Sequence, residues 1–347
     1  MKNIWMLEKD EKTKKIKETL ERNYNNYQLT EIKYSTIILP FYYIANLLSF
    51  NKPNIIIFRY LNDYRSFIKT FFRFIAEIIM VFLCAISRTK IYWICHNIDR
   101  ESTEYYPYLT KLRRALFVNC SEKILVTDMY LIPKAIDTFN VEKKIDYITF
   151  GKFNNSVGEN KQIERKIINY ISNIKREKNS FITLCAGMAN YKTDHFSKLP
   201  ELIDNAYKNG FNIYAIVMGD ISKFLANNYP EVLDYMKNSK NVLFIEGFHQ
   251  FNEEAISKYI DFYWRVYKDY STPATIYKSA EFKKPILTMN QGFLSIAVKK
   301  YKLGSIVKDN FVDIDNALNG LKEWDESYAN EFLKEHNWDV AVNKIIN

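Results

Sequence analysis

Glycine, proline, cysteine and histidine are all scarce in this sequence. The 347 residues include nine glycines, eight prolines, four cysteines and four histidines. Neither the GxGxxG pattern of dinucleotide-binding oxidoreductases nor the GxxxxGK(S/T) pattern of P-loop ATPases occurs, which argues against both classes. The cysteines stand singly, without a CxxC pair or a Cys/His cluster, so we expect neither a zinc site nor a disulfide framework.

Aromatic residues and positive charge are abundant instead. The chain has 26 tyrosines and 24 phenylalanines, and its 48% hydrophobic and 26% charged residues are typical of a globular protein. Residues 1–150 carry 23 Lys and Arg against 16 Asp and Glu, a net charge of +7, whereas the rest carries 26 against 24, or +2. The basic, aromatic first half indicates an anionic partner: a membrane surface, a lipid phosphate or a nucleic acid.

Strand-like apolar runs alternate with helical patterns along the whole chain, which predicts parallel, doubly wound sheets. The polar, turn-rich stretch 151–161 separates two similar halves and reads as a hinge. We therefore expect an α/β protein with two Rossmann-like domains, 1–155 and 156–325, that face each other across a cleft. We expect residues 326–347 to form an amphipathic helical segment. One possibility is that this segment crosses back to the first domain.

The most membrane-like stretch is Phe67–Ser87. It contains Lys69, Arg73 and Glu77, so its uncharged part is too short to span a bilayer. Two interpretations stay open: a well-buried helix, or a helix that lies in the membrane interface. The apolar run at the N-terminus is too short for a signal peptide, so we expect a cytoplasmic protein, with contact to the inner face of the cell membrane left open.

Ligands of open α/β sheets bind beyond the carboxyl ends of the strands. In the first half, one buried strand leads into a dense polar cluster, HNIDRES, that begins at His96. His96, Asp99 and Glu101 are candidate general bases, and Glu104 is a further carboxylate. The structural alternative is a loop of solvated charges around a packed histidine.

The strands of the second half end in glycine or in a Ser-Thr-Pro turn. Gly187, Gly219 and Gly247 follow three of them, and Lys192 lies shortly after Gly187. Glycine lets a ligand approach the backbone closely, and a lysine can meet a phosphate. Several such strand ends in one sheet predict a bound nucleotide.

The remaining strand end leads into Ser271, Thr272 and Pro273, which we expect to open a helix that runs to about Phe282. Ser or Thr at the N-cap with Pro just inside the helix is a strong start signal. The free N–H groups and positive dipole end of such a helix form a seat for phosphate. Asp313-Ile314-Asp315 has metal-binding spacing, but it reads better as an N-cap, so no metal site is expected.

Together these stretches resemble the GT-B glycosyltransferases, specifically the bacterial capsule and exopolysaccharide enzymes related to glycosyltransferase family 4. The resemblance covers nearly the whole chain by order of elements, and it rests on WICHNIDRES, KILVTD, the Gly187…Lys192 pair, VMGD, IEGF, STPATIYKSAEFKKPIL and QGFLSIAVKKYKLGSIV. It implies transfer of a sugar from a UDP- or GDP-sugar to a hydroxyl of a lipid-linked saccharide in surface polysaccharide synthesis. It implies no metal and no other cofactor.

The resemblance also implies roles for individual residues. His96 would lie near the reacting sugar, and Lys192 would bind the diphosphate. Gly247 and Phe248 would border the nucleotide base. Ser271 and Thr272 would hold the diphosphate at the helix start.

The chain departs from the family pattern at several of these places. Tyr270 and Lys278 stand where many relatives carry two donor-binding glutamates, and Met188 stands where an arginine often follows the first glycine. The glycine-rich loop after the first strand is replaced by LEKDEKT. We expect Tyr270 and Lys278 to contact the donor, and Asn97 and Arg65 to contact the acceptor.

The expected partners are a nucleotide sugar, a saccharide or lipid-diphosphate acceptor and, as an option, an anionic membrane. The basic residues suggested for the membrane face are Lys12, Lys14, Lys15, Arg65, Lys69, Arg73, Arg113 and Arg114. Two other functions stay open: an inactive GT-B regulator or partner subunit that binds nucleotide sugars, and a basic nucleic-acid-binding protein. The latter would need basic and aromatic residues interleaved on one surface, whereas most aromatic residues here lie in apolar runs.

Overall fold

In the computed structural model, which describes residues 1–152 and 160–347, the chain forms two compact units. The first unit comprises residues 1–151, 270–272 and 336–347, and the second comprises 152–269 and 273–335. The expected domain boundary at residue 155 and most of the expected hinge lie outside the described residues.

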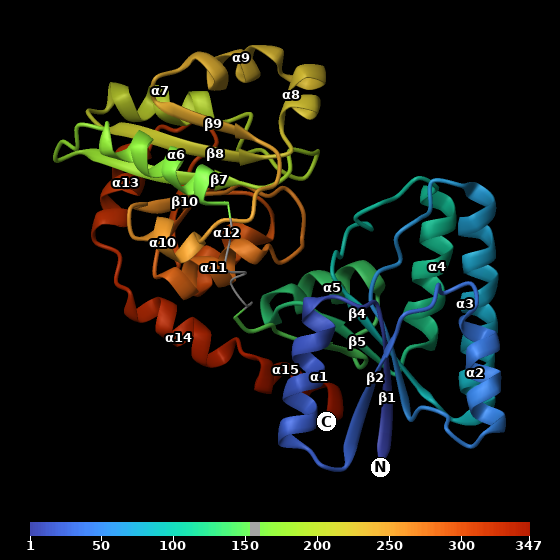
Figure 1. Ribbon diagram of the computed structural model, residues 1–347. Helices are drawn as coiled ribbons and strands as arrows, with labels where there is room; N and C mark the ends of the chain where they lie inside the picture. Colours follow the sequence, from blue (N-terminus) through green and yellow to red (C-terminus); the bar gives the residue numbers. More distant parts are fainter. Residues whose placement is uncertain (153–159) are drawn as a thin grey trace. The chain divides into compact units, whose positions relative to one another are not determined.

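The first unit contains one six-stranded sheet in the order β2-β1-β3-β4-β5-β6 (Figure 1). All of its strand pairs are parallel. Its elements are β1 (Lys2–Leu7), α1 (Glu11–Asn23), β2 (Tyr27–Ile32), α2 (Leu39–Leu48), β3 (Ile55–Phe58), α3 (Phe67–Ser87), β4 (Lys90–Cys95), α4 (Pro107–Cys120), β5 (Lys123–Val126), η1 (Met129–Leu131), α5 (Ile132–Phe139), β6 (Ile145–Tyr147) and α15 (Trp338–Ile346).

The second unit contains a six-stranded sheet in the order β12-β11-β10-β7-β8-β9, also parallel throughout. Its elements are α6 (Lys161–Ser172), β7 (Ser180–Ala186), α7 (Leu199–Lys208), β8 (Asn212–Gly219), α8 (Ser222–Asn228), α9 (Pro230–Asn238), β9 (Val242–Glu246), α10 (Glu253–Ser257), β10 (Phe262–Trp264), α11 (Ala274–Phe282), β11 (Ile286–Met289), α12 (Gly292–Lys300), β12 (Gly304–Val307), α13 (Ile314–Lys322) and α14 (Ser327–Glu335).

These strands and helices form where the local sequence favours them. All four residues of β3 are buried apolar residues, as expected for a parallel strand that is covered on both faces. Helix α1 begins after Asp10, whose carboxylate accepts a hydrogen bond from the N–H of Thr13 at 2.9 Å. The expected C-terminal helical segment is two helices, because Asn337 caps a new one by accepting from the N–H of Val340 at 3.0 Å.

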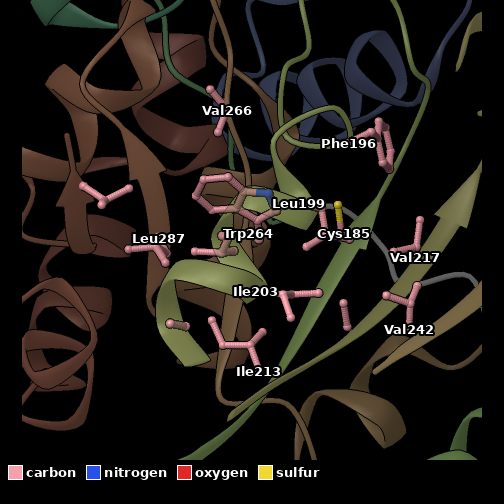
Figure 2. Close-up of a cluster of buried hydrophobic side chains, with 14 of the residues drawn as sticks. Cys185, Phe196, Leu199, Ile203, Ile213, Val217, Val242, Trp264, Val266 and Leu287 are labelled. Atoms are coloured by element: carbon pink, nitrogen blue, oxygen red, sulfur yellow. The ribbon is translucent and has the colours of Figure 1, made fainter. Parts of the chain in front are cut away.

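The core of the second unit lies between its sheet and the helices that cover it. Figure 2 shows Cys185 and Val217 on the central strands, packed toward Leu199 and Ile203 of α7. The buried indole of Trp264 lies in the same cluster, and its Nε1 donates to the carbonyl oxygen of His195 at 2.7 Å. This core fixes the carboxyl ends of β7, β8 and β10.

The predicted fold class, α/β with two Rossmann-like doubly wound sheets, is confirmed. In each unit the chain builds the sheet outward in one direction and then returns to build the other side. The switch falls between β1 and β3 in the first unit and between β7 and β10 in the second. Such switch points open a crevice at the carboxyl ends of the strands, so each is a candidate ligand-binding site.

The first interpretation of Phe67–Ser87, as a well-buried helix, is wrong. Phe67, Phe72, Phe82 and Ile86 are each more than half exposed. The expectation that the stretch is too short to span a bilayer is corrected as well. Its 21 residues measure about 30 Å, and within the described chain it is the one helix long and apolar enough, by length and composition, to cross a membrane.

Candidate functional site

A pocket of about 220 Å³ lies at the switch point of the second unit. It is formed by residues at the carboxyl ends of β7, β8 and β10, by the loop after β9 and by the starts of α10 and α11. The residues that line it are Leu184, Ala186, Gly187, Met218, Phe248, His249, Phe251, Glu253, Tyr263, Trp264, Arg265, Ala274, Thr275 and Lys278. Three predicted donor-binding residues, Gly187, Phe248 and Lys278, are among them.

Two glycines bring β7 and β8 together at the base of the pocket. Gly187 donates its N–H to the carbonyl oxygen of Met218 at 2.8 Å. A Cβ on Gly219 would lie 1.6 Å from the carbonyl oxygen of Gly187, and φ of Gly219 is +144°. Gly219 therefore supports the pocket from behind, although it does not line it. Gly247, with φ of +90°, directly precedes the lining residues Phe248 and His249.

Arg265 presents a buried guanidinium to the pocket. The residue is 7% exposed, and its Nη1 donates to the carbonyl oxygen of Ala186. Its Nη2 donates to the hydroxyl of Tyr267 at 2.8 Å. No carboxylate among the described residues forms an ion pair with it, and a buried charge without a counter-charge is costly. The pocket is therefore suited to an anionic ligand.

His195 holds the guanidinium of Arg265 from behind. Nη1 of Arg265 lies 2.6 Å from Nε2 of His195, and Nδ1 of His195 lies 3.3 Å from the carbonyl oxygen of Val266. Burial, together with the positive charge of Arg265, lowers the pKa of His195 well below its ordinary value. A neutral imidazole can accept from Arg265 at Nε2 and donate to Val266 at Nδ1. His195 is thus a positioning residue.

Two further donors in the pocket wall have no partner among the described residues: the hydroxyl of Tyr263 and Nε of Arg265. Both atoms are buried, and burial raises the pKa of Tyr263 well above its ordinary value, so its hydroxyl keeps its proton. Buried donors are normally satisfied. The wall of the pocket therefore holds two buried donors that no group of the described chain satisfies.

Lys278 lies on the side of α11 that faces the pocket, and its ammonium group pairs with the carboxylate of Glu253. In the family that the sequence resembles, many members carry a glutamate at the position of Lys278. The structure supplies a carboxylate at this place from α10 instead. Its contact with the donor stays a prediction.

Lys192 does not line the pocket. Its Nζ forms an ion pair with Oδ2 of Asp269 at 3.0 Å, and Lys268 pairs with Asp194 at 2.8 Å. These pairs and the bridge between Thr193 and Tyr267 join the loop after β7 to the loop after β10. A diphosphate contact of Lys192 also stays a prediction.

The expected Ser/Thr cap of α11 is wrong. The N-cap residue is Pro273, without a side-chain cap bond, and the helix begins at Ala274. Tyr270, Ser271 and Thr272 belong to the first unit, where the hydroxyl of Thr272 lies 2.9 Å from that of Thr127. The physical reason is that the hydroxyl of Thr272 is engaged by Thr127 instead of capping the helix, and that Pro273 has an extended backbone, with φ of −75° and ψ of 146°. Ala274 and Thr275 therefore bring the helix start to the pocket.

In the first unit, His96 follows β4 and lies between two aromatic rings. Its ring stacks on Tyr60 at 4.3 Å and faces Phe150 at 6.0 Å. Its Nε2 is buried and has no partner among the described residues. Burial, followed by the charges of Lys12 and Arg59, lowers its pKa well below the ordinary value. The imidazole is neutral, as a proton acceptor must be.

The other residues of the HNIDRES cluster are mostly committed to the fold. Nδ2 of Asn97 donates to Ser102 at 2.7 Å. Glu101 is buried, and its carboxylate accepts from Nη1 of Arg114 at 2.7 Å and from the N–H of Leu61 at 3.3 Å. Its predicted role as a base stays a prediction.

Asp99 and Arg65 remain exposed. Asp99 lies 3.9 Å from Nζ of Lys134 and accepts from the N–H of Tyr270 at 3.3 Å. Arg65 precedes the first residue of α3 by two positions in the sequence. Their predicted roles as base and as acceptor contact stay predictions.

Lys12 lies at the switch point of the first unit, with its ammonium group 4.4 Å from the ring centre of Phe150. Burial lowers the pKa of Lys12 to about 8, and the charge of Arg59 acts in the same direction while Asp10 opposes it. The unfolded chain binds this proton more tightly than the folded one. The free energy of unfolding therefore contains a contribution from Lys12 that rises with pH between about 8 and the ordinary value of 10.5.

We expect Lys12→Met to be more stable than the wild type at neutral pH, because it removes a charge that the fold partly shields from water. The advantage should shrink as the pH rises past 8 and the wild-type lysine loses its proton. Urea unfolding of both proteins at neutral and at alkaline pH measures the difference. Lys14→Met, at an exposed position on the same helix, should show no such change, and an equal change in both variants would contradict the assignment to Lys12.

Arg265 and His195 were missed by the sequence analysis. One signal was present: Arg265 interrupts FYWRVY, an otherwise apolar stretch, and a charge in such a run requires a partner or a ligand. Nothing in the sequence connects it with His195, seventy residues earlier. Among the described residues, no group of three or more His, Cys, Asp and Glu side chains is placed to hold a metal ion.

Comparisons with known proteins identify the fold. No family model and no curated protein matches the sequence, but solved structures match over 99% of this chain. HepE from Anabaena, in complex with UDP and glucose, matches over 98% of its own chain with a TM-score of 0.62 and 10% identity. The lipopolysaccharide outer core galactosyltransferase WaaB matches over 97% with a TM-score of 0.63 and 12% identity. The UDP-GlcNAc 2-epimerase from Methanocaldococcus jannaschii matches over 98% with a TM-score of 0.54 and 13% identity. With its two parallel six-stranded sheets, the chain has the GT-B fold.

Proposed function

We propose that this protein transfers a sugar from a nucleotide-sugar donor to a hydroxyl group of a saccharide acceptor. The observation that carries the proposal is the buried guanidinium of Arg265, which reaches the pocket without a carboxylate partner among the described residues. Arginine recognises phosphate through paired N–H donors. A nucleoside diphosphate supplies that charge, and the HepE structure contains UDP.

In the proposed reaction, the bond between the anomeric carbon and a diphosphate oxygen breaks while a bond from the acceptor oxygen to that carbon forms. Negative charge grows on the departing diphosphate, and donors fixed where charge grows lower the barrier. We assign this role to Arg265 and to the first turn of α11, in place of a metal ion. The proton of the acceptor hydroxyl passes to a base in an inverting reaction or to the departing phosphate in a retaining one. His96, Asp99 and Glu101 are the candidate bases.

The finer assignments are proposals of the same kind. We propose a UDP- or GDP-sugar as the donor, a lipid-linked saccharide as the acceptor, and a role in bacterial capsule or exopolysaccharide synthesis of the family 4 type. The protein would then work in the cytoplasm at the inner face of the cell membrane. The basic first half of the chain supports this, and WaaB acts on the lipopolysaccharide outer core.

A catalytically inactive regulator that binds a nucleotide sugar is the second candidate. It is favoured by the replacement of the two family glutamates by Tyr270 and Lys278, of which Lys278 is neutralised by Glu253. The GT-B fold also carries other chemistry, as the epimerase among the structural neighbours illustrates.

Incubation with UDP-, GDP-, CMP- and dTDP-sugars and a lipid-linked acceptor distinguishes these functions. For a transferase, we expect one donor to release its nucleotide only when the acceptor is present, with the sugar recovered on the lipid. A regulator binds a nucleotide sugar and leaves it intact. A nucleic-acid-binding protein binds none of them, and that result would refute the proposal.

A further inference from the structure

Helix α3 turns two of its charged residues, Arg73 and Glu77, toward the inside of the first unit and a row of large apolar residues toward the outside. Its exposed apolar side chains recur every three or four residues, at Phe67, Phe71, Ile75, Ile78, Phe82 and Ile86. This spacing places them on one face of the helix. A helix on the surface of a protein in water normally has the opposite arrangement.

The inward face of α3 is held by a buried ionic network. The carboxylate of Glu77 accepts from Nε of Arg73 at 3.0 Å and from Nη2 of Arg113, on α4, at 2.7 Å. Nη1 of Arg113 also pairs with Asp63 at 3.1 Å. The prediction that Arg73 and Arg113 face a membrane is therefore wrong, because both side chains are buried. The network fastens α3 to the unit, so its outward face is the face that a partner can reach.

The apolar surface continues onto the neighbouring helix α2. Helices α2, α3 and α4 lie side by side (Figure 1), and α3 packs against both of the others. Ile38, Phe41 and Leu48 on or beside α2 are exposed. We call the outward faces of α2 and α3 the apolar ridge. Contiguous apolar surfaces of this kind mark interaction sites.

The exposed charges within the segment that forms the apolar ridge have one sign. Between Lys33 and Lys90 the only carboxylates in the sequence are Asp63 and Glu77, and both side chains are fully buried. The exposed charges of this segment are all cationic: Lys33, Lys52, Arg65, Lys69, Arg88 and Lys90, of which Lys90 is ion-paired with Glu122. Lys69 lies in the first turn of α3 and Arg88 directly follows its last residue. A partner of the ridge must therefore accept aromatic and aliphatic side chains and carry negative charge around them.

We propose that the apolar ridge docks on the surface of a lipid bilayer with anionic headgroups, with α3 lying in the interface. An interfacial helix buries its apolar face at the boundary between headgroups and acyl chains, and flanking cations meet anionic lipids. A second copy of the chain fits less well, because a symmetric dimer through this face would bring two sets of like charges together. This inference does not depend on sugar transfer. The proposed function includes contact with a membrane but names no surface for it, and the apolar ridge supplies that surface.

Flotation with vesicles tests the proposal on the full chain. We expect the wild type to float with phosphatidylglycerol vesicles and to float much less with phosphatidylcholine vesicles or at high salt. The double variant Phe82→Asp/Ile86→Asp changes side chains that are 63% and 66% exposed, so it should fold normally and lose at least about ten-fold in vesicle affinity. The matched control is Tyr207→Asp/Val312→Asp, in the second unit, at positions that are 72% and 66% exposed. The control should float like the wild type.

A charge-reversal variant tests the electrostatic half of the proposal. Lys69→Glu/Arg88→Glu keeps the apolar ridge, and we expect its affinity for phosphatidylglycerol vesicles to fall by about five-fold or more for each cation. Failure of the wild type to float at low salt, or equal flotation of the wild type and Phe82→Asp/Ile86→Asp, overturns the proposal. Sedimentation that shows a dimer of the wild type but a monomer of this double variant also overturns it, because the ridge would then be an interface between copies. None of these readouts requires sugar transfer, so a failed transfer assay leaves this test intact.

Discussion

Arg265→Ala is expected to weaken the binding of a nucleoside diphosphate by about a hundred-fold or more. Hydrogen bonds to charged groups contribute about 1.5–3 kcal/mol each, and a guanidinium can offer two of them to one phosphate group. Loss of both corresponds to at least about 3 kcal/mol, or about two orders of magnitude in Kd. Titration calorimetry with UDP, GDP and dTDP measures the change, with the tightest ligand of the wild type as the reference.

Three further variants make this result interpretable. Arg265→Gln keeps an N–H donor for the carbonyl of Ala186 but removes the charge, so it should fold and still bind poorly. Arg265→Lys keeps the charge but loses the planar fork, and we expect an intermediate affinity. Lys268→Ala removes an exposed cation from the same loop, ion-paired with Asp194, and it should bind normally. A folded Arg265→Gln that binds like the wild type would show that the anion does not sit at this guanidinium.

Gly219→Ala is expected to cost the second unit several kcal/mol of stability and to abolish nucleotide binding. The new Cβ would lie 1.6 Å from the carbonyl oxygen of Gly187, so backbone must move away from backbone. Strain at φ of +144° adds about 1–3 kcal/mol. Because the clash lies where β7 and β8 meet the pocket, the displaced segment is the one that carries Gly187 and Ala186. Chemical denaturation and calorimetric titration together measure both effects.

Gly210→Ala is the matched control for this variant. Gly210 also has positive φ, +79°, but a Cβ there would meet nothing within 4 Å. We expect it to cost only the conformational strain, about 1–2 kcal/mol, and to leave binding unchanged. If both variants lost similar amounts of stability and nucleotide affinity, the close contact between Gly219 and Gly187 would not be the cause.

Much of the fold could be predicted from local sequence. Apolar runs such as NIIIF specify strands buried on both faces, and their alternation with helical patterns specifies parallel sheets. Cap residues located some helix starts, as Asp10 does for α1. The start of α11 was misplaced because Thr272 has a stronger preference for the cap than Pro273, yet its hydroxyl lies beside Thr127, far away in sequence.

The candidate site was only half predictable, for a related reason. Strand ends marked by glycine indicated where a ligand would bind, since the carboxyl ends of parallel strands share one edge of the sheet. Which side chains fill that edge depends on contacts between distant segments. Lys192, close to the predicted glycine, pairs with Asp269, whereas Arg265, directly after the apolar strand β10, reaches the pocket with His195 behind it.

By itself, the sequence determined the two doubly wound sheets, the edges at which ligands are expected to bind and the apolar character of α3, because periodicity and strand-end chemistry are local properties. Only the tertiary structure decided which face of α3 points outward and which cation enters the pocket. Both depend on where a buried charge finds its counter-charge. Glu77 draws Arg73 and Arg113 inward and leaves the phenylalanines outside, while Arg265 has no carboxylate partner among the described residues and is left to a ligand.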